Sequence, residues 1–319
     1  MFEWTSEKWL VFFEKKGRRK NNKMNIDFNN KWKKYDKNPV FGNRETGTVF
    51  DAQVTKFGVG KFRMYFSWRC KKALAYTESM DAVNWSEPKI CMEYDLTTGW
   101  EDDINRSCVI YKDGKYHMWY TGQARGFSKL GYAVSEDGVK FERVLNMPIL
   151  VPEYPHEGFS VMNPYVIWDE EKNLFRMWYA SGETHEPNVL CYAESQDGIK
   201  WEKSLLNPIY VKGNKDSWDC DRVGGCEVHK LPDGNYLMFY IGYSDIDTAR
   251  IGAAISPDGV TQWKQVEKNP LIVPTEGGFD ACACYKPTVF LDEDKIYLWY
   301  NGRNGDEEYI GLATLDLNM

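Results

Sequence analysis

Short apolar runs alternate with polar residues along most of the chain, and a helical period is nearly absent. The stretch 107–144 shows one unit of this pattern, with apolar or alternating runs over 107–111, 115–121, 130–135 and 139–144. An Asp-Gly pair, the strongest short signal for a tight hairpin, follows the first and the third run. We therefore predict that this unit is a four-stranded antiparallel meander.

The same unit occurs five times, and an aromatic pair marks the second strand of each copy. Successive pairs lie roughly 54 to 61 residues apart, which is the scale of one propeller blade. The sequence predicts an all-β fold, a five-bladed β-propeller with four-stranded blades. The five pairs are Tyr65-Phe66, Trp119-Tyr120, Trp178-Tyr179, Phe239-Tyr240 and Trp299-Tyr300.

The two ends of the repeated region complement each other. The last unit stops at 311–314 without a fourth strand, whereas a fourth-strand pattern stands alone at 32–39. We expect 32–39 to pair with the last blade, which would pair both open edges and close the ring. Proline suits the end of such a strand, and it occurs there in Asn38-Pro39, Met147-Pro148, Asn207-Pro208 and Asn269-Pro270.

The first residues differ from the rest of the chain. Residues 1–23 are basic and lack alternation, so we hypothesise that Met24 is the natural start and that 1–23 are a disordered or misannotated extension. Residues 24–319 then form a single propeller domain. The apolar run at 9–13 is too short for an export signal, and no run approaches the ~18 residues that span a bilayer. We expect a cytoplasmic protein with no membrane partner.

Composition narrows the class of partner. The formal net charge of −7 is opposite to that of a protein that binds phosphate backbones, so nucleic acid is not an expected partner. Aromatic residues make up 15% of the chain, with 13 Trp and 20 Tyr, which supplies a core and suits sugar faces. In a cytoplasmic protein the eight Cys are expected to be free thiols. Their spacing does not match a zinc site, and we expect no metal and no cofactor.

One end of the propeller is predicted to carry the chemistry. In a four-stranded meander, the loops after strands 1 and 3 share one end, where this chain has short Asp-Gly turns. The loops between strands 2 and 3 and between blades share the other end, and functional residues concentrate on loops that a rigid scaffold presents. These loops carry Trp68, Arg69, Trp100, Asp102, Asp103, Arg106, Gln123, Arg125, Glu183, His185, Glu186, Trp218, Asp221, Arg222, Glu227, Asp245, Asp247, Asp280, Lys286 and Arg303.

The repeats, exemplified by 115–122 and 131–138, resemble the five-bladed propellers of glycoside hydrolase families 43, 32 and 130 over about residues 32 to 316. Those families place acidic residues at the axial starts of the innermost strands, and the resemblance implies this position for Asp51. The equivalent positions of blades 2, 3 and 5 hold Arg106, Asn163 and Lys286, and the Glu-Xaa-Pro acid motif is absent. Further acids must come from neighbouring loop positions, namely Asp102, Asp103, Glu183, Asp221, Glu227 and Asp280.

Glycoside hydrolysis requires two carboxyl groups with unequal pKa values. We assign Asp51 as the general base, and Asp103 or Asp221 as the proton donor or the group that adjusts its pKa. Trp68, Trp100 and Trp218 would form walls that face the sugar. The substrate-binding set is completed by Arg69, Asp102, Arg106, Gln123, Arg125, Glu183, Arg222, Glu227, Asp280, Lys286 and Arg303.

We therefore predict a glycoside hydrolase of an oligo- or polysaccharide, with an anionic or a furanosidic sugar as the candidate substrate. Two alternatives to this function remain open. The many cationic groups suit either an anionic sugar or inorganic phosphate as co-substrate, and the second case would make the protein a glycoside phosphorylase. A carbohydrate-binding propeller without catalytic activity is the other alternative, because a fold does not determine a function.

Overall fold

The computed structural model of the protein describes residues 26–28, 31–58 and 60–317. This part of the chain forms twenty β-strands and no α-helix, so the all-β prediction is confirmed. None of its helices is long and apolar enough to cross a membrane. The predicted extension over 1–23 and the proposed start at Met24 lie outside the described residues. Three short 3-10 helices are η1 (Arg69–Lys71), η2 (Leu96–Thr98) and η3 (Pro155–Glu157).

The strands form five four-stranded antiparallel units, which we number as blades 1 to 5 by their innermost strands. A single parallel pairing of Ser160 with Ser128 joins blades 2 and 3 into one eight-stranded sheet. Blade 1 consists of β2 (Val49–Lys56), β3 (Phe62–Trp68), β4 (Ala73–Ser79) and β5 (Lys89–Glu93). Blade 2 consists of β6 (Asp103–Lys112), β7 (Lys115–Ala124), β8 (Phe127–Ser135) and β9 (Glu142–Arg143). Blade 3 consists of β10 (Ser160–Asp169), β11 (Leu174–Gly182), β12 (Pro187–Ser195) and β13 (Glu202–Lys203).

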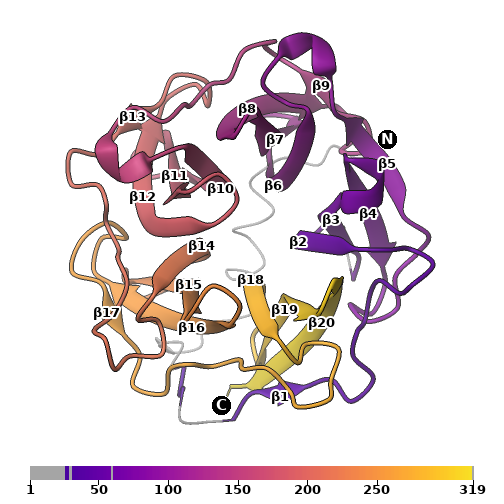
Figure 1. Cartoon of the computed structure of the whole chain (residues 1–319), viewed down its shortest axis with the longest axis vertical. Helices are drawn as coiled ribbons and strands as arrows, with labels where there is room; N and C mark the ends of the chain where they lie inside the picture. Colours follow the sequence, from indigo (N-terminus) through magenta and orange to yellow (C-terminus); the bar gives the residue numbers. More distant parts are fainter. Residues whose placement is uncertain (1–25, 29–30, 59, 318–319) are drawn as a thin grey trace, which may run out of the picture.

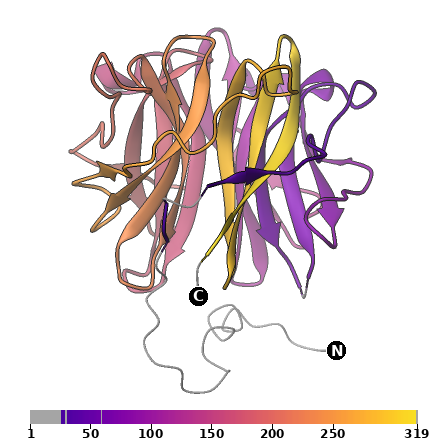
Figure 2. The ribbon, with the colours of Figure 1, turned by 90° about the horizontal axis from the view of Figure 1, so that it is seen from below.

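Blade 4 consists of β14 (Arg222–Lys230), β15 (Tyr236–Tyr243), β16 (Ala249–Ser256) and β17 (Lys264–Gln265). Blade 5 consists of β18 (Ala283–Leu291), β19 (Lys295–Asn304), β20 (Glu307–Asp316) and β1 (Lys33–Lys34). Figure 1 shows the five blades around a common centre, with β2, β6, β10, β14 and β18 nearest to it. Figure 2 shows the same strands from the side, running along that axis.

The N-terminal strand lies beside the last blade, as predicted. Strand β1 pairs with β20 through Lys33 opposite Thr314 and Lys34 opposite Ala313. A further bridge joins Phe41 to Ile310. The segment therefore occupies the fourth-strand place in blade 5, although it precedes blade 1 in the sequence.

The fourth strands are shorter than predicted. In blade 2 the expected strand 139–144 is reduced to β9, because Asp137 Oδ1 accepts hydrogen bonds from the backbone N–H groups of Val139 (2.8 Å) and Lys140 (3.2 Å). These bonds extend the turn into the region where we expected strand. The first strand is longer than predicted, since β6 begins at Asp103 and not at Ser107. Positions 103–106, which we expected in a loop, thus belong to the innermost strand.

Side chains of the aromatic pairs connect neighbouring blades. Trp119 Nε1 donates to Gly198 O at 2.8 Å, and Trp178 Nε1 donates to Gly259 O at 2.7 Å. Trp299 Nε1 of blade 5 donates to Ala82 O of blade 1 at 3.1 Å. Each tryptophan is fully buried, so each indole N–H finds its partner on the next blade.

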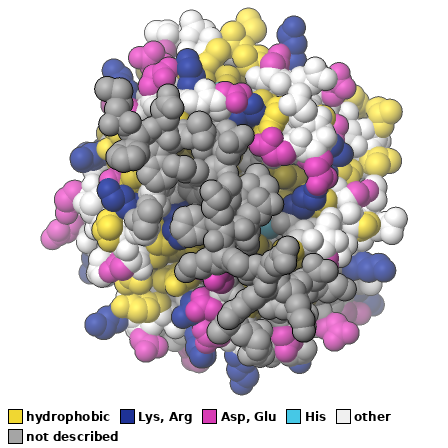
Figure 3. All heavy atoms as spheres, turned by 180° about the vertical axis from the view of Figure 1, so that it is seen from behind, with side chains coloured by type: hydrophobic (Ala, Val, Ile, Leu, Met, Phe, Trp, Pro, Cys, Tyr) yellow, Lys and Arg dark blue, Asp and Glu magenta, His cyan; other side chains and the backbone are white. Residues whose placement is uncertain are grey.

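The hairpins between strands 2 and 3 turn at the end of the ring that faces the viewer in Figure 1. The short turns between strands 1 and 2 lie at the opposite end, which Figure 3 shows in space-filling form. Acidic and basic side chains are interspersed around the visible rim of that opposite end.

Candidate functional site

A β-bulge interrupts the innermost strand of every blade near its start. The register of pairing shifts between Phe50 and Gln53, and equivalent shifts occur in β6, β10, β14 and β18. A bulge redirects a side chain and is common beside active sites. The bulge residues are the positions that the family resemblance aligned, namely Asp51, Arg106, Asn163 and Lys286, with Gly225 in blade 4.

The four non-glycine bulge residues have left-handed backbone conformations, with φ between 47° and 55°. Such a conformation is unfavourable for residues other than glycine and clusters at functional sites. The preceding blade holds three of these residues in place through their backbone N–H groups. Asp51 N–H donates to Asn301 Oδ1 (2.8 Å), Arg106 N–H to Ser67 Oγ (2.9 Å) and Asn163 N–H to Thr121 Oγ1 (3.3 Å).

Asp51 is the carboxylate that these bulges bring to the axis. It is 3% exposed, and its Oδ2 lies 3.2 Å from Arg106 Nε. Burial raises the pKa of Asp51, and the charges of Arg106 and Lys286 oppose that shift without cancelling it. A carboxyl group in this environment holds its proton to higher pH than an exposed one, which suits a proton donor.

Cationic residues surround Asp51. Arg106 Nη1 donates to Asn105 Oδ1 (3.0 Å), and its Nη2 donates to His185 O (3.3 Å). Lys286 is buried and forms no ion pair within 4.0 Å with any residue between 26 and 317 that the structure describes. Arg69 pairs with Glu308 at 2.9 Å and lies over the Phe50 ring. Asp51, Arg106, Lys286 and Arg69 thus form the centre of what we call the axial site.

A turn over 183–186 adds a second carboxyl group to the axial site. Burial raises the pKa of Glu186, and Arg106, Arg222 and Arg303 are close enough to act against this shift. The turn is held from blade 2: Gln123 Nε2 donates to Thr184 O (3.2 Å), and Ser128 Oγ donates to the same carbonyl (2.6 Å). Gln123 therefore positions the turn from a buried place, where we had expected a residue that binds substrate.

Asp221, Arg222 and Glu183 form a charged group beside this turn. Arg222 Nε lies 2.7 Å from Asp221 Oδ2, and Arg222 Nη1 lies 4.0 Å from Glu183. Arg303 Nη2 donates to Asp247 O at 2.6 Å. Asp103 is half-buried; burial raises its pKa, while Lys72, Arg69 and Arg106 oppose the shift, so it too lies near the axial site.

Three buried polar atoms in and beside the axial site accept or donate no hydrogen bond among the described residues: Asp51 Oδ2, whose contact with Arg106 Nε is an ion pair only, Asn163 Oδ1 and Arg222 Nη1. Buried polar groups are nearly always hydrogen-bonded in proteins, and each exception needs an explanation. Such unpaired atoms at the bulges are consistent with a site for a polar ligand.

Three predicted substrate-binding residues, Trp100, Trp218 and Asp280, instead take part in a packing arrangement that recurs in several blades. Trp100 is buried against Gly122 and Gly131, and Trp218 packs in the same way on Gly242 and Gly252. The small glycines leave room for the indole rings, which therefore face the blades and not the axis.

Asp280 follows the equivalent aromatic residue, Phe279, and forms a buried ion pair with Lys34 of β1. The Tyr300 hydroxyl also donates to this carboxylate, at 2.9 Å. Blades 2 and 3 repeat the unit with the pairs Glu101–Arg143 and Glu157–Lys203. These contacts give Asp280 a structural role, and the axial site described here does not include Trp100, Trp218 or Asp280.

Glu227 also connects blades. Its Oε2 accepts a hydrogen bond from Val289 N–H (3.1 Å), just as Gln53 of blade 1 binds the backbone of Val109 in blade 2. Its Oε1 lies 3.1 Å from His229 Nε2. Glu227 lies two residues beyond the bulge of β14, so its carboxylate is engaged below the axial site.

The remaining predicted residues lie at the edge of the site. Trp68 Nε1 donates to Thr46 O (2.8 Å), and its ring contacts Phe66. Arg125 is exposed at the tip of the β7–β8 hairpin, and Asp102 is half-buried just before β6.

Sequence reasoning missed Glu308, Tyr243 and Tyr285, and gave Glu186 no role. Tyr243 is buried and Tyr285 is partly buried, and both lie close enough to Asp51 for its charge to act on them. Burial raises the pKa of both hydroxyls, so they remain neutral donors. Tyr243 occupies the repeat position of Arg69, Gln123 and Arg303, four residues beyond the first member of the aromatic pair. Aligning the repeats would therefore have identified it.

The protein resembles several characterised and uncharacterised proteins in sequence. An uncharacterized protein of Mycobacterium tuberculosis is 31% identical over 194 residues, which are 59% of this chain and 61% of that protein. A beta-1,2-mannobiose phosphorylase of Thermoanaerobacter sp. is 26% identical over 162 residues, 46% of this chain and 50% of that enzyme. The matched part of the chain thus spans less than two thirds of both relatives. A 1,2-beta-oligomannan phosphorylase of the same organism is 24% identical over 274 residues, 67% of this chain and 90% of that enzyme.

Solved structures share the fold. A protein described as a glycoside hydrolase aligns with a TM-score of 0.73 and 18% identity, covering 98% of this chain and 96% of that one. A structure from a study of the GH130 family of mannoside phosphorylases aligns with a TM-score of 0.70 and 14% identity, covering 92% and 96%. At these identities the likeness shows the fold alone.

The family model that matches this chain describes the N-terminal domain of glycosyl hydrolases family 32. The match covers residues 60–221, which is half of the chain, and it includes blade 2, blade 3 and most of blade 1. Together with the propeller fold of the structural neighbours, this match shows that the chain belongs to the glycosyl hydrolases family 32 N-terminal domain family, within the superfamily of five-bladed propeller glycosidases and phosphorylases.

Proposed function

We propose that the protein cleaves glycosidic bonds by phosphorolysis, with Asp51 as the proton donor and inorganic phosphate as the attacking group. One observation carries this proposal: of the five bulge positions around the axis, one holds a carboxylate, whereas Arg106 and Lys286 occupy two others. Phosphorolysis needs a single acid and a binding site for an anion. Sequence reasoning preferred hydrolysis with Asp51 as base, and the raised pKa of Asp51 favours the acid role instead.

In the proposed reaction, the protonated Asp51 carboxyl donates its proton to the leaving glycosidic oxygen. A phosphate oxygen attacks the anomeric carbon as the bond between that carbon and the leaving oxygen breaks. The products are a sugar 1-phosphate and a shortened saccharide, and the proton of the incoming hydrogen phosphate restores Asp51. Arg106, Lys286 and Arg222 would bind the phosphate, since charge-assisted hydrogen bonds are the strong ones.

The relatives named as phosphorylases of β-1,2-linked mannosides suggest the first substrates to test. We expect β-1,2-mannobiose and longer β-1,2-mannan oligosaccharides to release a sugar 1-phosphate only when phosphate is present. Asp51→Asn should lower kcat by ~10²–10⁴-fold, the usual contribution of a general acid. Lys286→Met should raise the KM for phosphate by about tenfold and leave the KM for the sugar nearly unchanged.

Equal turnover without phosphate would exclude phosphorolysis. That result would favour hydrolysis, for which Glu186 offers the second carboxyl group because it lies close enough to Asp51 for the Asp51 charge to raise its pKa. Binding of these saccharides without any turnover would support a carbohydrate-binding protein instead.

We also infer that the β1–β20 pairing closes the ring and thereby keeps the axial site together. The support comes from contacts between blades 5 and 1: Asn301 holds the bulge at Asp51, and Val54 N–H donates to Thr288 Oγ1 at 3.0 Å. The Asp51 bulge is therefore shaped by the last blade.

A further inference from the structure

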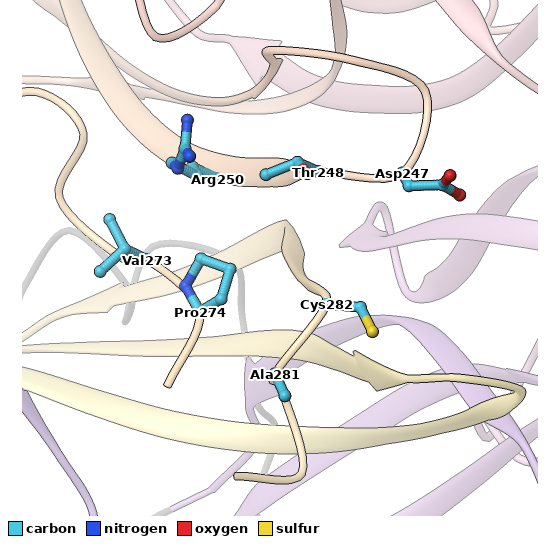
Figure 4. A pocket seen from close by; sticks show the side chains of 7 residues that line it. All are labelled: Asp247, Thr248, Arg250, Val273, Pro274, Ala281 and Cys282. Atoms are coloured by element: carbon cyan, nitrogen blue, oxygen red, sulfur yellow. The ribbon is translucent and has the colours of Figure 1, made fainter. Parts of the chain in front are cut away.

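A surface pocket lies between blades 4 and 5, outside the groups that the proposed reaction uses. Figure 4 shows its two sides: Asp247, Thr248 and Arg250 lie in a row on one side, and the other side is formed by Val273, Pro274, Ala281 and Cys282. The first side belongs to the turn before β16 and to β16 itself. The second side belongs to the chain that leads into β18.

The two walls of the pocket differ in chemistry. Asp247 and Arg250 line one wall, where Asp247 Oδ1 also lies 3.7 Å from Arg303 Nη2, and the apolar residues Val273 and Pro274 line the facing wall. Within the described part of the chain, no hydrogen bond or ion pair engages the Arg250 side chain. Its donors are therefore available to a ligand.

Both walls are held in place by hydrogen bonds. Asp245 Oδ1 accepts from the backbone N–H groups of Asp247 (2.9 Å) and Thr248 (2.8 Å). On the facing wall, Lys34 Nζ donates to Val273 O at 2.6 Å and also binds the buried carboxylate of Asp280. The pocket is thus formed before any ligand arrives, which lowers the entropic cost of binding.

One arginine connects the pocket to the axial site. Arg303 Nη2 donates to Asp247 O at 2.6 Å, and the same guanidinium group is close enough to Glu186 to lower the pKa of that carboxyl. A saccharide that extends outward from the axial site between blades 4 and 5 would therefore reach the pocket next.

We propose that this pocket binds a sugar unit of the substrate that lies beyond the linkage being cleaved. A pyranose ring has an apolar face of C–H groups and an edge of hydroxyl groups, and the pocket offers Val273 and Pro274 to the face and Asp247 and Arg250 to the edge. The proposal rests on the proposed function, because it assumes an oligosaccharide substrate.

The test compares β-1,2-mannan oligosaccharides of increasing length, from the disaccharide to the pentasaccharide. In the wild-type protein the KM should fall once the chain is long enough to reach the pocket. Arg250→Ala, which removes the hydrogen-bond donors, and Ala281→Trp, which fills the space, should raise the KM of the long saccharides by roughly tenfold. Both variants should turn over the disaccharide as the wild type does.

Arg44→Ala is the matched control, since Arg44 is an exposed arginine that pairs with Glu307 away from the pocket. If Arg250→Ala keeps the wild-type dependence on chain length, or slows the disaccharide equally, the pocket proposal is overturned. Arg250→Ala alone suffices for this decision should Ala281→Trp fail to fold.

A binding measurement separates this proposal from the proposed function. The Asp51→Asn protein is labelled for NMR and titrated with β-1,2-mannotetraose, while the backbone amides of Thr248, Arg250 and Cys282 are followed. Shifts at these amides and at the axial site support the pocket. Shifts at the axial site alone overturn the pocket and leave the proposed function standing. No shift anywhere rejects β-1,2-mannosides as substrates, and the pocket proposal fails with them.

Discussion

At the residue scale, Asp51 combines an unfavourable backbone with an unfavourable charge. Its φ of 51° and its burial both cost free energy, and neither improves the packing of blade 1. Natural proteins keep such a combination where function requires it, since local rules are broken mainly at functional sites. This is the physical reason for placing the chemistry at Asp51 and not at an exposed carboxylate of the same end.

The raised pKa of Asp51 predicts how stability changes with pH. The folded protein holds this proton more tightly than the unfolded chain, whose pKa is near 3.8. The resulting stabilisation is complete below that pH and is lost as the pH rises through the raised pKa of the folded state. We therefore expect Asp51→Asn to gain stability relative to the wild type as the pH rises above 3.8, as measured by thermal denaturation.

Asp280→Asn provides a control of opposite sign. Burial raises the pKa of Asp280, but the hydrogen bond and charge of Lys34, together with hydrogen bonds from Tyr300 and Cys284, outweigh it, and the net pKa is lowered. The stability that the ionised Asp280 carboxylate contributes to the folded protein is present above pH 3.8 and is lost as the pH falls through the lowered pKa. Parallel pH trends in the two variants would contradict our assignment of Asp51.

At the element scale, asparagine side chains replace missing strand pairing. Asn207 Oδ1 accepts from Tyr192 N–H at 2.8 Å, and Asn207 Nδ2 donates to Tyr192 O at 3.0 Å. Asn38 and Asn269 bind Leu312 and Ala253 in the same way. The amide group thus imitates a peptide unit beside the third strand, which explains why asparagine precedes proline in blades 3, 4 and 5.

Because the Asn207 amide replaces a strand partner, its removal should lower the stability of the protein. Asn207→Ala leaves Tyr192 N–H without a partner, whereas Tyr192 O still accepts a hydrogen bond from Ser204 N–H at 2.9 Å. We therefore expect a loss of about 1–3 kcal/mol in the free energy of unfolding, measured by chemical denaturation. Met147→Ala is the matched control, because Met147 precedes Pro148 at the same place in blade 2 and is exposed. Equal losses in the two variants would show that the asparagine amide has no special role.

At the scale of the whole molecule, two neighbouring lysines of β1 test how the N-terminal strand holds blade 5. Lys34 reaches the buried carboxylate of Asp280, whereas Lys33 pairs with the exposed carboxylate of Asp316. Removal of one partner from a buried pair leaves an uncompensated charge, while an exposed pair contributes little.

We expect Lys34→Ala to lower the free energy of unfolding by about 3–5 kcal/mol. Lys33→Ala should lower it by less than about 1 kcal/mol. Denaturation curves of both variants measure the difference. Similar small effects would mean that β1 is dispensable for the stability of the ring.

The sequence alone determined the all-β class, the five repeats and the displaced strand. These features depend on local alternation, on turn residues and on the spacing of similar motifs, all of which are written in the order of the residues. The resemblance to the propeller families implied the axial position of Asp51 and the equivalent positions of Arg106 and Lys286, although it did not reveal the bulges that aim them.

Only the tertiary structure decided which polar and aromatic residues face the axis. Trp100 and Asp280 look like site residues in the sequence, but glycines from other strands accept the indole ring and Lys34 from the start of the chain reaches the carboxylate. Glu186 and Tyr243 join Asp51 through the meeting of blades 1, 3 and 4. Contacts between residues far apart in the chain cannot be read from local patterns, because burial and charge depend on neighbours that only folding supplies.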